Sequence, residues 1–299
     1  MTTPATAVAA RHSDSCSSRS EFVLSSRDFK DITEALHADT GIFLPESKSA
    51  IVYSRLSKRL RALGLRSFRQ YCALLTTDDG VDERQRMIAA LTTNVTRFFR
   101  EPHHFEHLRT AVLPQLVHSA RHGGRIRIWS AGCSSGQEVY STAISVLVGM
   151  PDAGKFDVKI LATDIDHEMT TIGARGVYSE AEMLGVPADL CRRWFTRAQA
   201  RGGVNWKVCD EVRRLVTFRD LNLIGPWPMT GQFDAIFCRN TVIYFEEQTQ
   251  SQVWERFVPV LRPGGVLYIG HSERLCGPAA AALVRVGLTA YRLPEAAAK

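Results

Sequence analysis

Glycine and acidic residues lie at positions typical of a nucleotide-binding site. The segment 131–136 (Ala-Gly-Cys-Ser-Ser-Gly) joins a predicted strand to a predicted helix, and its glycines let backbone approach a bound molecule closely. Glu138, in the first turn of that helix, could bind the ammonium group of a methionyl moiety or could interact only with the helix dipole. Asp164 ends the next predicted strand, where a carboxylate can accept hydrogen bonds from both ribose hydroxyls. Asp166 competes for that role, and an acid here could equally cap the following helix.

The glycine loop alone is a weak signal, but its pairing with an acid favours a ligand that contains adenosine. Asp164 comes 28 residues after Gly136, further than the roughly 20 of a dinucleotide fingerprint. The pairing does not choose between NAD and S-adenosylmethionine.

Four further segments carry polar residues in a specific order. Residues 92–101 read Thr-Thr-Asn-Val-Thr-Arg-Phe-Phe-Arg-Glu, and residues 238–245 follow a strand at the predicted ligand-binding edge. Residues 261–265 (Leu-Arg-Pro-Gly-Gly) form a tight turn, and residues 270–273 (Gly-His-Ser-Glu) end a strand. In this order the segments resemble those of the chemotaxis-receptor glutamate O-methyltransferases, which esterify glutamate side chains using S-adenosylmethionine. The resemblance covers nearly the whole chain after residue 21.

The resemblance implies a set of site residues. The positions that match the family's cofactor contacts are Asn94, Thr96, Arg100, Glu138, Asp164, Asn222, Leu223, Arg239 and Asn240. Arg100 and Tyr244 match the positions that frame the accepting carboxylate, and they are the candidate catalytic residues. The loop 136–140 reads Gly-Gln-Glu-Val-Tyr where the family has Gly-Glu-Glu-Pro-Tyr, but it keeps the aligned Glu138. The implied cofactor is S-adenosylmethionine, with S-adenosylhomocysteine as product.

The chemistry of such a transfer is compatible with these residue types. A glutamate whose pKa is near 4.3 is about 500-fold more ionised than protonated at neutral pH, so the acceptor needs no general base. Arg100 or Arg239 could orient a carboxylate bidentately, and Tyr244 could donate one hydrogen bond to it. We therefore expect orientation of the acceptor rather than its activation.

Histidines and cysteines near these segments raise other chemistries. His103 and His107 would share one helix face, but no carboxylate or cysteine completes a ligand set in sequence. We interpret them as helix-surface or linker residues and expect no metal, because methyl transfer needs none. Cys133 and Cys238 are interpreted as small packing residues rather than nucleophiles.

The elements that position these residues follow from hydrophobic spacing. Apolar residues three and four apart predict helices over about 29–36, 51–63, 68–75 and 87–91, with Gly41 and Gly64 at helix ends. In the second of these, Ile51, Val52, Leu56, Leu60 and Leu63 are expected on one face. A linking helix is predicted from Pro102 to Val117, and Pro114 should kink or split it.

After residue 125 the pattern predicts strands that alternate with helices. Strands are expected at 126–128, 158–164, 233–238 and 266–270. Helices are expected at 138–148, with Val148 among the inward residues, and along Val253, Phe257 and Leu261. Such alternation implies a parallel sheet covered by helices on both faces.

The predicted fold class is thus α/β: a Rossmann-like methyltransferase sheet with a small inserted β-subdomain, preceded by an all-α N-terminal domain. The expected divisions are a disordered tail (1–20), a helical domain (21–91), a signature and linker helix (92–124) and a cofactor-binding domain (125–299). The insertion, at about 176–215, is expected to contain a hairpin.

The composition of the chain indicates the cellular compartment in which it functions. A chain of 299 residues with 45% hydrophobic residues can form two domains with a sizeable core. Its longest apolar runs are too short to span a bilayer, and no secretory signal is expected. Seven cysteines without a Cys-x-x-Cys pair indicate reduced thiols. Composition therefore favours a cytoplasmic protein that does not insert into the membrane, and we expect a monomer. The resemblance implies that it is recruited to membrane receptor arrays.

Charge gathers in one stretch of the N-terminal part. Residues 48–77 hold seven basic residues and no acidic one, although the net charge of the chain is only +6. From charge alone, a solvated helix face is favoured over a surface for an anionic partner. The resemblance favours the cytoplasmic helices of membrane chemoreceptors, which are acidic, and the candidate substrate-binding residues are Arg55, Lys58, Arg59 and Arg61. No nucleic-acid signature accompanies the charge, so no stable binding of nucleic acid is expected.

Two other functions remain open from sequence. One is a methyltransferase for nucleic acid or a small molecule, and the other is a non-catalytic regulator that binds S-adenosylmethionine or its product. Some relatives use the inserted hairpin to bind a receptor's C-terminal peptide through a turn with glycine and proline. Residues 197–203 read Arg-Ala-Gln-Ala-Arg-Gly-Gly, so we expect no such tethering here.

Overall fold

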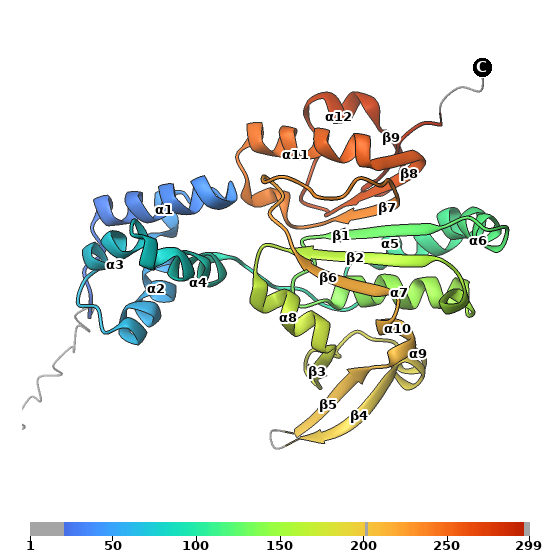
Figure 1. Ribbon diagram of the computed structural model, residues 1–299, viewed down its shortest axis with the longest axis horizontal. Coiled ribbons are helices and arrows are strands. Elements are labelled where there is room, and N and C mark those ends of the chain that lie inside the picture. The colour runs from blue at the N-terminus through green and yellow to red at the C-terminus, as the bar shows by residue number, and fades with distance from the viewer. Residues whose placement is uncertain (1–20, 201–202, 296–299) are drawn as a thin grey trace, which may run out of the picture.

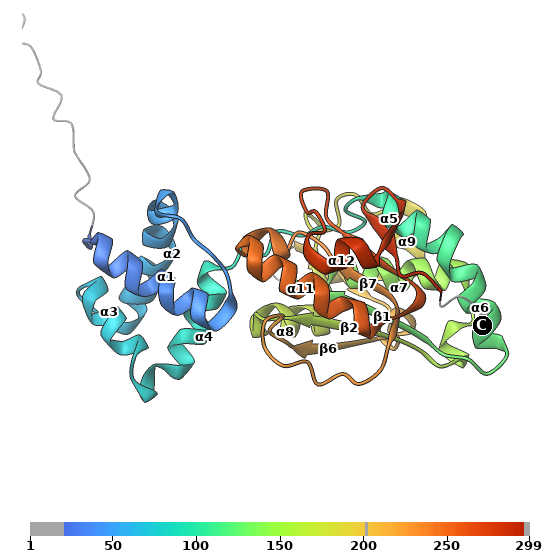
Figure 2. The ribbon, with the colours of Figure 1, turned by 90° about the horizontal axis from the view of Figure 1, so that it is seen from above.

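The computed structural model describes residues 21–200 and 203–295 of the chain. The predicted tail (1–20) lies outside the described residues. A group of four helices stands beside a larger α/β part (Figure 1), and Figure 2 shows the ends of α8 (His167–Arg175) and α11 (Glu247–Val260) facing that group. Among the described residues no helix has the length and hydrophobicity to span a membrane.

The four N-terminal helices are α1 (Ser26–Thr40), α2 (Ser49–Leu63), α3 (Phe68–Leu75) and α4 (Val81–Leu91), with short 3-10 turns at Glu46–Lys48 and Asp78–Gly80. Ser25 begins α1 with a capping box, because its side chain accepts from the amide of Asp28 while the Asp28 carboxylate accepts from the amide of Ser25. Gly41 and Gly64 end α1 and α2 in the left-handed conformation, as predicted. The buried face of α2 is narrower than predicted. Val52, Leu56 and Leu60 are buried, whereas Ile51 and Leu63 are exposed.

The linking helix is split, as the proline predicts. It consists of α5 (Pro102–His107), a π-helical turn η3 (Leu108–Val112) and α6 (Leu113–Arg121). Pro114 lies at the start of α6 and has no N–H to continue the ladder, so the preceding turn widens to π spacing.

The sheet has the strand order β6-β2-β1-β7-β8-β10-β9. Five strands are parallel: β1 (Ile126–Ala131), β2 (Val158–Asp164), β6 (Val216–Asp220), β7 (Phe233–Cys238) and β8 (Leu261–Ile269). The antiparallel strands β9 (Val284–Gly287) and β10 (Ala290–Arg292) complete one edge. The order reverses between β1 and β7, and open α/β sheets bind ligands outside the carboxyl ends of strands at such a point.

Helices cover both faces of the sheet. One core joins Ile126 and Ile128 of β1 to α7 (Gln137–Gly149) and the linking helix, while the other joins Trp129 of β1 to α11. The remaining helices of this part are α8, α10 (Asp210–Arg213) and α12 (Gly277–Ala282), with 3-10 turns at Ala153–Lys155 and Val242–Tyr244. Three details of the prediction were wrong: Val148 is exposed, Leu261 begins β8 instead of continuing α11, and the predicted turn at 261–265 lies within β8.

The predicted insertion forms its own small sheet. Its strands β3 (Val177–Ser179), β5 (Gly203–Val208) and β4 (Phe195–Ala200) are antiparallel, and α9 (Ala188–Trp194) precedes β4. The sheet projects beyond α8 (Figure 1), so it is placed beside the main sheet and not within it. Residues 201 and 202 of the predicted hairpin turn lie outside the described residues.

Candidate active site

A cavity of about 420 Å³ lies between the N-terminal helices and the carboxyl ends of the parallel strands. Its lining includes every residue that the sequence singled out for the cofactor and the acceptor: Asn94, Thr96, Arg100, Glu138, Asp164, Asn222, Leu223, Arg239, Asn240 and Tyr244. Its size is in the range of small-molecule sites. The chain therefore brings five separate segments to one concave surface.

The segment between α1 and α2 forms a wall of this cavity that the sequence did not predict. Ile42 pairs with Phe245 in an isolated bridge, and the amide of Phe43 donates to the carbonyl of Tyr244 at 2.9 Å. Asn222 holds the same region from the other side, since its Nδ2 donates to the carbonyl of Asp39 at 2.7 Å. The N-terminal helices thus contribute part of the site itself.

The glycine loop after β1 approaches the neighbouring loop closely. Gly132 has a φ of +86°, and a Cβ placed there would lie 2.2 Å from Thr241 Oγ1. Ser134 also has a positive φ, and its amide donates to Asp164 Oδ2 at 2.7 Å. The loop is therefore fixed by contacts to both flanking strand ends.

Gly132→Ala should destabilise the protein more than Gly123→Ala. Both glycines have nearly the same positive φ, +86° and +87°, but nothing lies within 4 Å of a Cβ at Gly123. Both substitutions incur the strain of a left-handed alanine, about 1–2 kcal/mol. Only Gly132→Ala adds a clash, for which we expect a further loss of about 1–3 kcal/mol in urea unfolding. Equal losses in the two variants would contradict the close approach.

Glu138 is a buried carboxylate with two hydrogen-bond donors. Its Oε1 accepts from Ser130 Oγ at 2.8 Å, and its Oε2 accepts from Arg239 Nη1 at 2.9 Å. Burial raises the pKa of Glu138, and the adjacent guanidinium opposes that rise. The paired carboxylate presents negative charge to the cavity, where it fits an ammonium group.

Asp164 and Asp166, which the sequence could not separate, have different surroundings. Asp164 lines the cavity, and its two oxygens accept from the amides of Ser134 and Asp166. Burial raises the pKa of Asp164, and these backbone hydrogen bonds oppose the rise. Asp166 instead caps α8 through the amide of Glu168 and accepts from Asn94 Nδ2 at 2.8 Å. Only Asp164 is thus placed to receive a ligand.

Arg239 connects both sides of the site. Besides its bond to Glu138, its Nη2 lies 3.2 Å from Glu101 Oε2 and donates to the carbonyl of Arg100. Glu101 in turn accepts from His271 Nδ1 at 2.6 Å, and hydrogen bonding and charge together lower the pKa of Glu101 to about 2 against the opposing effect of burial. No local pattern predicts this role for Glu101, because Arg239 and His271 lie far from it in the chain.

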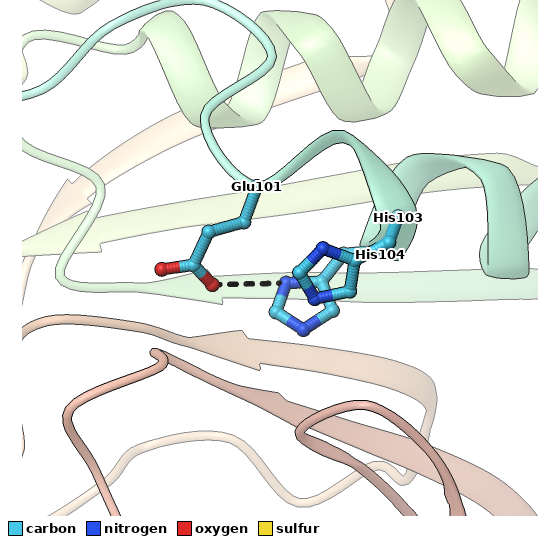
Figure 3. A group of neighbouring side chains, drawn as sticks. All are labelled: Glu101, His103 and His104. Atoms are coloured by element: carbon cyan, nitrogen blue, oxygen red, sulfur yellow. Dashed lines mark ion pairs between the residues drawn. The ribbon is translucent and has the colours of Figure 1, made fainter.

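Glu101, His103 and His104 form the cluster in Figure 3, with ligand-type atoms within 4.8 Å of one another. The predicted pair was different: His107 bonds to the hydroxyl of Tyr268 at 2.9 Å and is not part of this group. The guanidinium of Arg239 already supplies the positive charge beside the Glu101 carboxylate. A metal ion there would be repelled by it, and we assign none to this cluster.

The stability of the fold should fall in mild acid because of His104. This ring is fully buried, and burial, followed by the charge of Arg239, lowers its pKa to about 3. An unfolded histidine titrates near 6.5. The stability is therefore complete above pH 6.5 and is lost as the pH falls from 6.5 towards 3, by about 1.4 kcal/mol per unit. Urea unfolding at about pH 7 and about pH 5.5 should show this loss in the wild type and a smaller one in His104→Gln.

Glu273 fixes the loop that follows β7. Its buried carboxylate accepts from the amides of Gly270 (2.6 Å), Asn240 (2.9 Å), Thr241 (2.8 Å) and Val242 (2.9 Å). Burial raises the pKa of Glu273, whereas the four amides favour its charged form. Asn240 has a positive φ of 57°, so this carboxylate stabilises an unusual backbone that leads to Arg239 and Tyr244. The polar end of β8 was visible in sequence, but this role was not.

The predicted substrate-binding residues are not equivalent. Arg55 lines the cavity and donates to the carbonyls of Leu91 and Thr92, which end α4. Arg59 forms a bidentate ion pair with buried Glu83, and Arg61 pairs with Glu21. Lys58 is exposed and does not line the cavity. The acid-free stretch is therefore partly balanced by acids from other segments.

The thiols near the site are packed, as predicted. Cys133 and Cys238 are buried, and burial raises the pKa of each well above its usual value. Every cysteine within the described residues is a free thiol.

Comparison with known proteins places the chain in a family. Residues 94–287 match the model described as "CheR methyltransferase, SAM binding domain", and residues 27–92 match "CheR methyltransferase, all-alpha domain". A "Probable chemotaxis protein methyltransferase" of Rhizobium etli is 51% identical over 257 residues, which cover 86% of this chain and 96% of that relative. "Chemotaxis protein methyltransferase 2" of Pseudomonas aeruginosa is 44% identical over 275 residues, covering 91% and 94%. The "Chemotaxis protein methyltransferase" of Escherichia coli is 39% identical over 253 residues, covering 84% and 85%. The chain belongs to the CheR family of S-adenosylmethionine-dependent methyltransferases.

Proposed function

We propose that this chain transfers the methyl group of S-adenosylmethionine to glutamate side chains on the cytoplasmic helices of chemoreceptors. The observation that supports this most is the convergence of the cofactor and acceptor residues on one cavity. The chemotaxis names of the relatives support this substrate class. The product would be a glutamate methyl ester, which adjusts the signalling state of the receptor.

The cavity fits S-adenosylmethionine. Glu138 offers a buried carboxylate to the ammonium group of the methionyl part, and Asp164 offers one to the ribose hydroxyls. Leu223 adds apolar surface beside the position of the adenine, and Asn94 and Thr96 line the wall formed by the signature. When bound, S-adenosylmethionine supplies a methyl group on a positively charged sulfur.

The residues of the chain would act by orientation. Arg100 and Tyr244 line the cavity, and both can donate hydrogen bonds to an incoming carboxylate. A carboxylate oxygen held by these two donors would accept the methyl group, and the electron pair of the broken carbon–sulfur bond would remain on sulfur. No proton moves, so the site requires no base. Two charges disappear in the reaction, and exclusion of water from the cavity favours that step.

Transfer of labelled methyl groups tests the proposal. Wild-type enzyme, labelled S-adenosylmethionine and receptor cytoplasmic fragments should give protein-bound label that mild base releases as methanol. Arg100→Ala should lose this label while it keeps its fold, as measured by circular dichroism. Label that resists base would contradict the proposal, and so would normal binding of S-adenosylhomocysteine without transfer to any receptor.

A further inference from the structure

The opening of the cavity is unusually apolar for a surface. Four of its lining side chains are large hydrophobic groups with high exposure: Phe43 (49%), Ile51 (44%), Val95 (79%) and Ile243 (37%). Twelve large hydrophobic side chains are exposed among the described residues, so a third of them lie on this one cavity. We call these four residues the cavity mouth. Exposed apolar groups that gather around a site mark a contact surface.

The four residues come from segments that are distant in sequence. Phe43 precedes α2, Ile51 lies within it, Val95 belongs to the segment between α4 and α5, and Ile243 lies in the turn after β7. The Phe43–Tyr244 hydrogen bond joins two of these segments directly. The N-terminal helical part and the α/β part therefore contribute to one surface.

Basic side chains lie on the same cavity. Lys48 and Arg97 are exposed, and Arg100 is half-buried. Across residues 21–200 and 203–295 no carboxylate forms an ion pair with any of the three. The acids of the cavity, Glu138 and Asp164, are buried instead. The surface that a partner meets is thus positive and apolar at once.

We propose that the cavity mouth docks an acidic amphipathic helix of the partner protein, with the apolar side chains of that helix against Phe43, Ile51, Val95 and Ile243. This inference rests on the proposed function. It deepens that function because the contact with the receptor helix becomes both apolar and electrostatic instead of purely electrostatic. A polyanion such as nucleic acid would use the three basic residues but would leave the four apolar groups in water. A helix that carries an acid beside apolar residues satisfies both sets.

The cavity mouth also differs, as a docking surface, from the part of α2 that carries Arg59 and Arg61. Arg59 and Arg61 are already paired with acids of this chain, so a partner would have to compete with those contacts. Lys48 and Arg97 have no such competitor among the described residues and lie beside the apolar groups. The contact should therefore depend more on the mouth than on Arg59 or Arg61.

Matched substitutions test the mouth. Val95→Asp and Ile51→Glu place a charge on it, while Val23→Asp and Val81→Glu change exposed residues of similar exposure (77% and 49%) that do not line the cavity. Calorimetry would measure the affinity of each variant for a receptor cytoplasmic fragment with S-adenosylhomocysteine present. We expect about tenfold weaker binding or more for the two mouth variants, equivalent to about 1.4 kcal/mol, and no change for the controls.

Circular dichroism and urea unfolding should show that all four variants keep their fold, which excludes a general loss of folding. Equal fragment binding by mouth and control variants would overturn the inference, and so would wild-type enzyme that binds no fragment. Wild-type enzyme that binds the fragment through the mouth but transfers no methyl group would refute only the proposed function. A further contrary result would be nucleic acid that competes with the fragment for the wild-type enzyme and fails to bind the two mouth variants. That result would identify a polyanion as the partner of the mouth and would overturn the inference.

Discussion

Arg239→Met is expected to abolish the binding of S-adenosylhomocysteine and to destabilise the protein by about 3–5 kcal/mol. Arg239 is 5% exposed and contacts Glu138 at 2.9 Å and Glu101 at 3.2 Å. Its removal leaves two carboxylates without a counter-charge in a region of low dielectric. The variant also frees the carbonyl of Arg100, which Arg239 holds. Urea unfolding and calorimetry would measure both effects.

Two companion variants separate charge from geometry. Arg239→Lys keeps one positive charge but cannot reach both carboxylates and the carbonyl, so it should recover only part of the stability. Arg239→Met combined with Glu138→Gln removes a charge from each side and should recover stability without restoring ligand binding. If the double variant were no more stable than Arg239→Met, the ion pair would not be the source of the effect.

Asp164→Asn should weaken the binding of S-adenosylhomocysteine by about 10- to 100-fold, and Asp166→Asn should change it little. Hydrogen bonds to a charged acceptor contribute about 1.5–3 kcal/mol, and only Asp164 lines the cavity. An asparagine at 164 would also turn an amide N–H towards a donor, the amide of Ser134 or of Asp166. At 166 an asparagine caps a helix as well as aspartate does.

Both variants should unfold cooperatively, which circular dichroism would check, and calorimetry would compare their affinities with that of the wild type. A larger loss in Asp166→Asn than in Asp164→Asn would reverse the assignment of the two acids. It would also contradict the proposal that the ribose binds at the end of β2.

Regular elements could be predicted because their signals are local. The apolar runs of β1, β2 and β7 and the spacing in α1 and α7 predicted these elements, and the structure has them. Strands β6 and β9 were missed because they are short and contain no buried residue, and β10 was missed because it has only three residues, of which one is buried. Leu261 continued the helical spacing of Val253 and Phe257, and only its pairing with Phe233 of β7 places it in a strand.

The site was predictable where residues follow strands, since the carboxyl ends of parallel strands meet at one edge. Glu138, Asp164 and Arg239 could be placed together in this way. The roles of Glu101 and Glu273 were missed because their partners are backbone amides or side chains brought near only by the fold. The wall formed before α2 was also missed, because nothing in the residues around Phe43 indicates a contact with Tyr244.

The chemical form of the transferred methyl group distinguishes glutamate esterification from methylation of any other side chain. Receptor fragments methylated by the wild-type enzyme would be digested and sequenced by tandem mass spectrometry, and the modified residue would be identified in each peptide. We expect methyl groups on glutamate side chains, removed by mild base and absent after reaction with Arg100→Ala. Methylation of lysine, arginine or another nitrogen, stable to base, would contradict it.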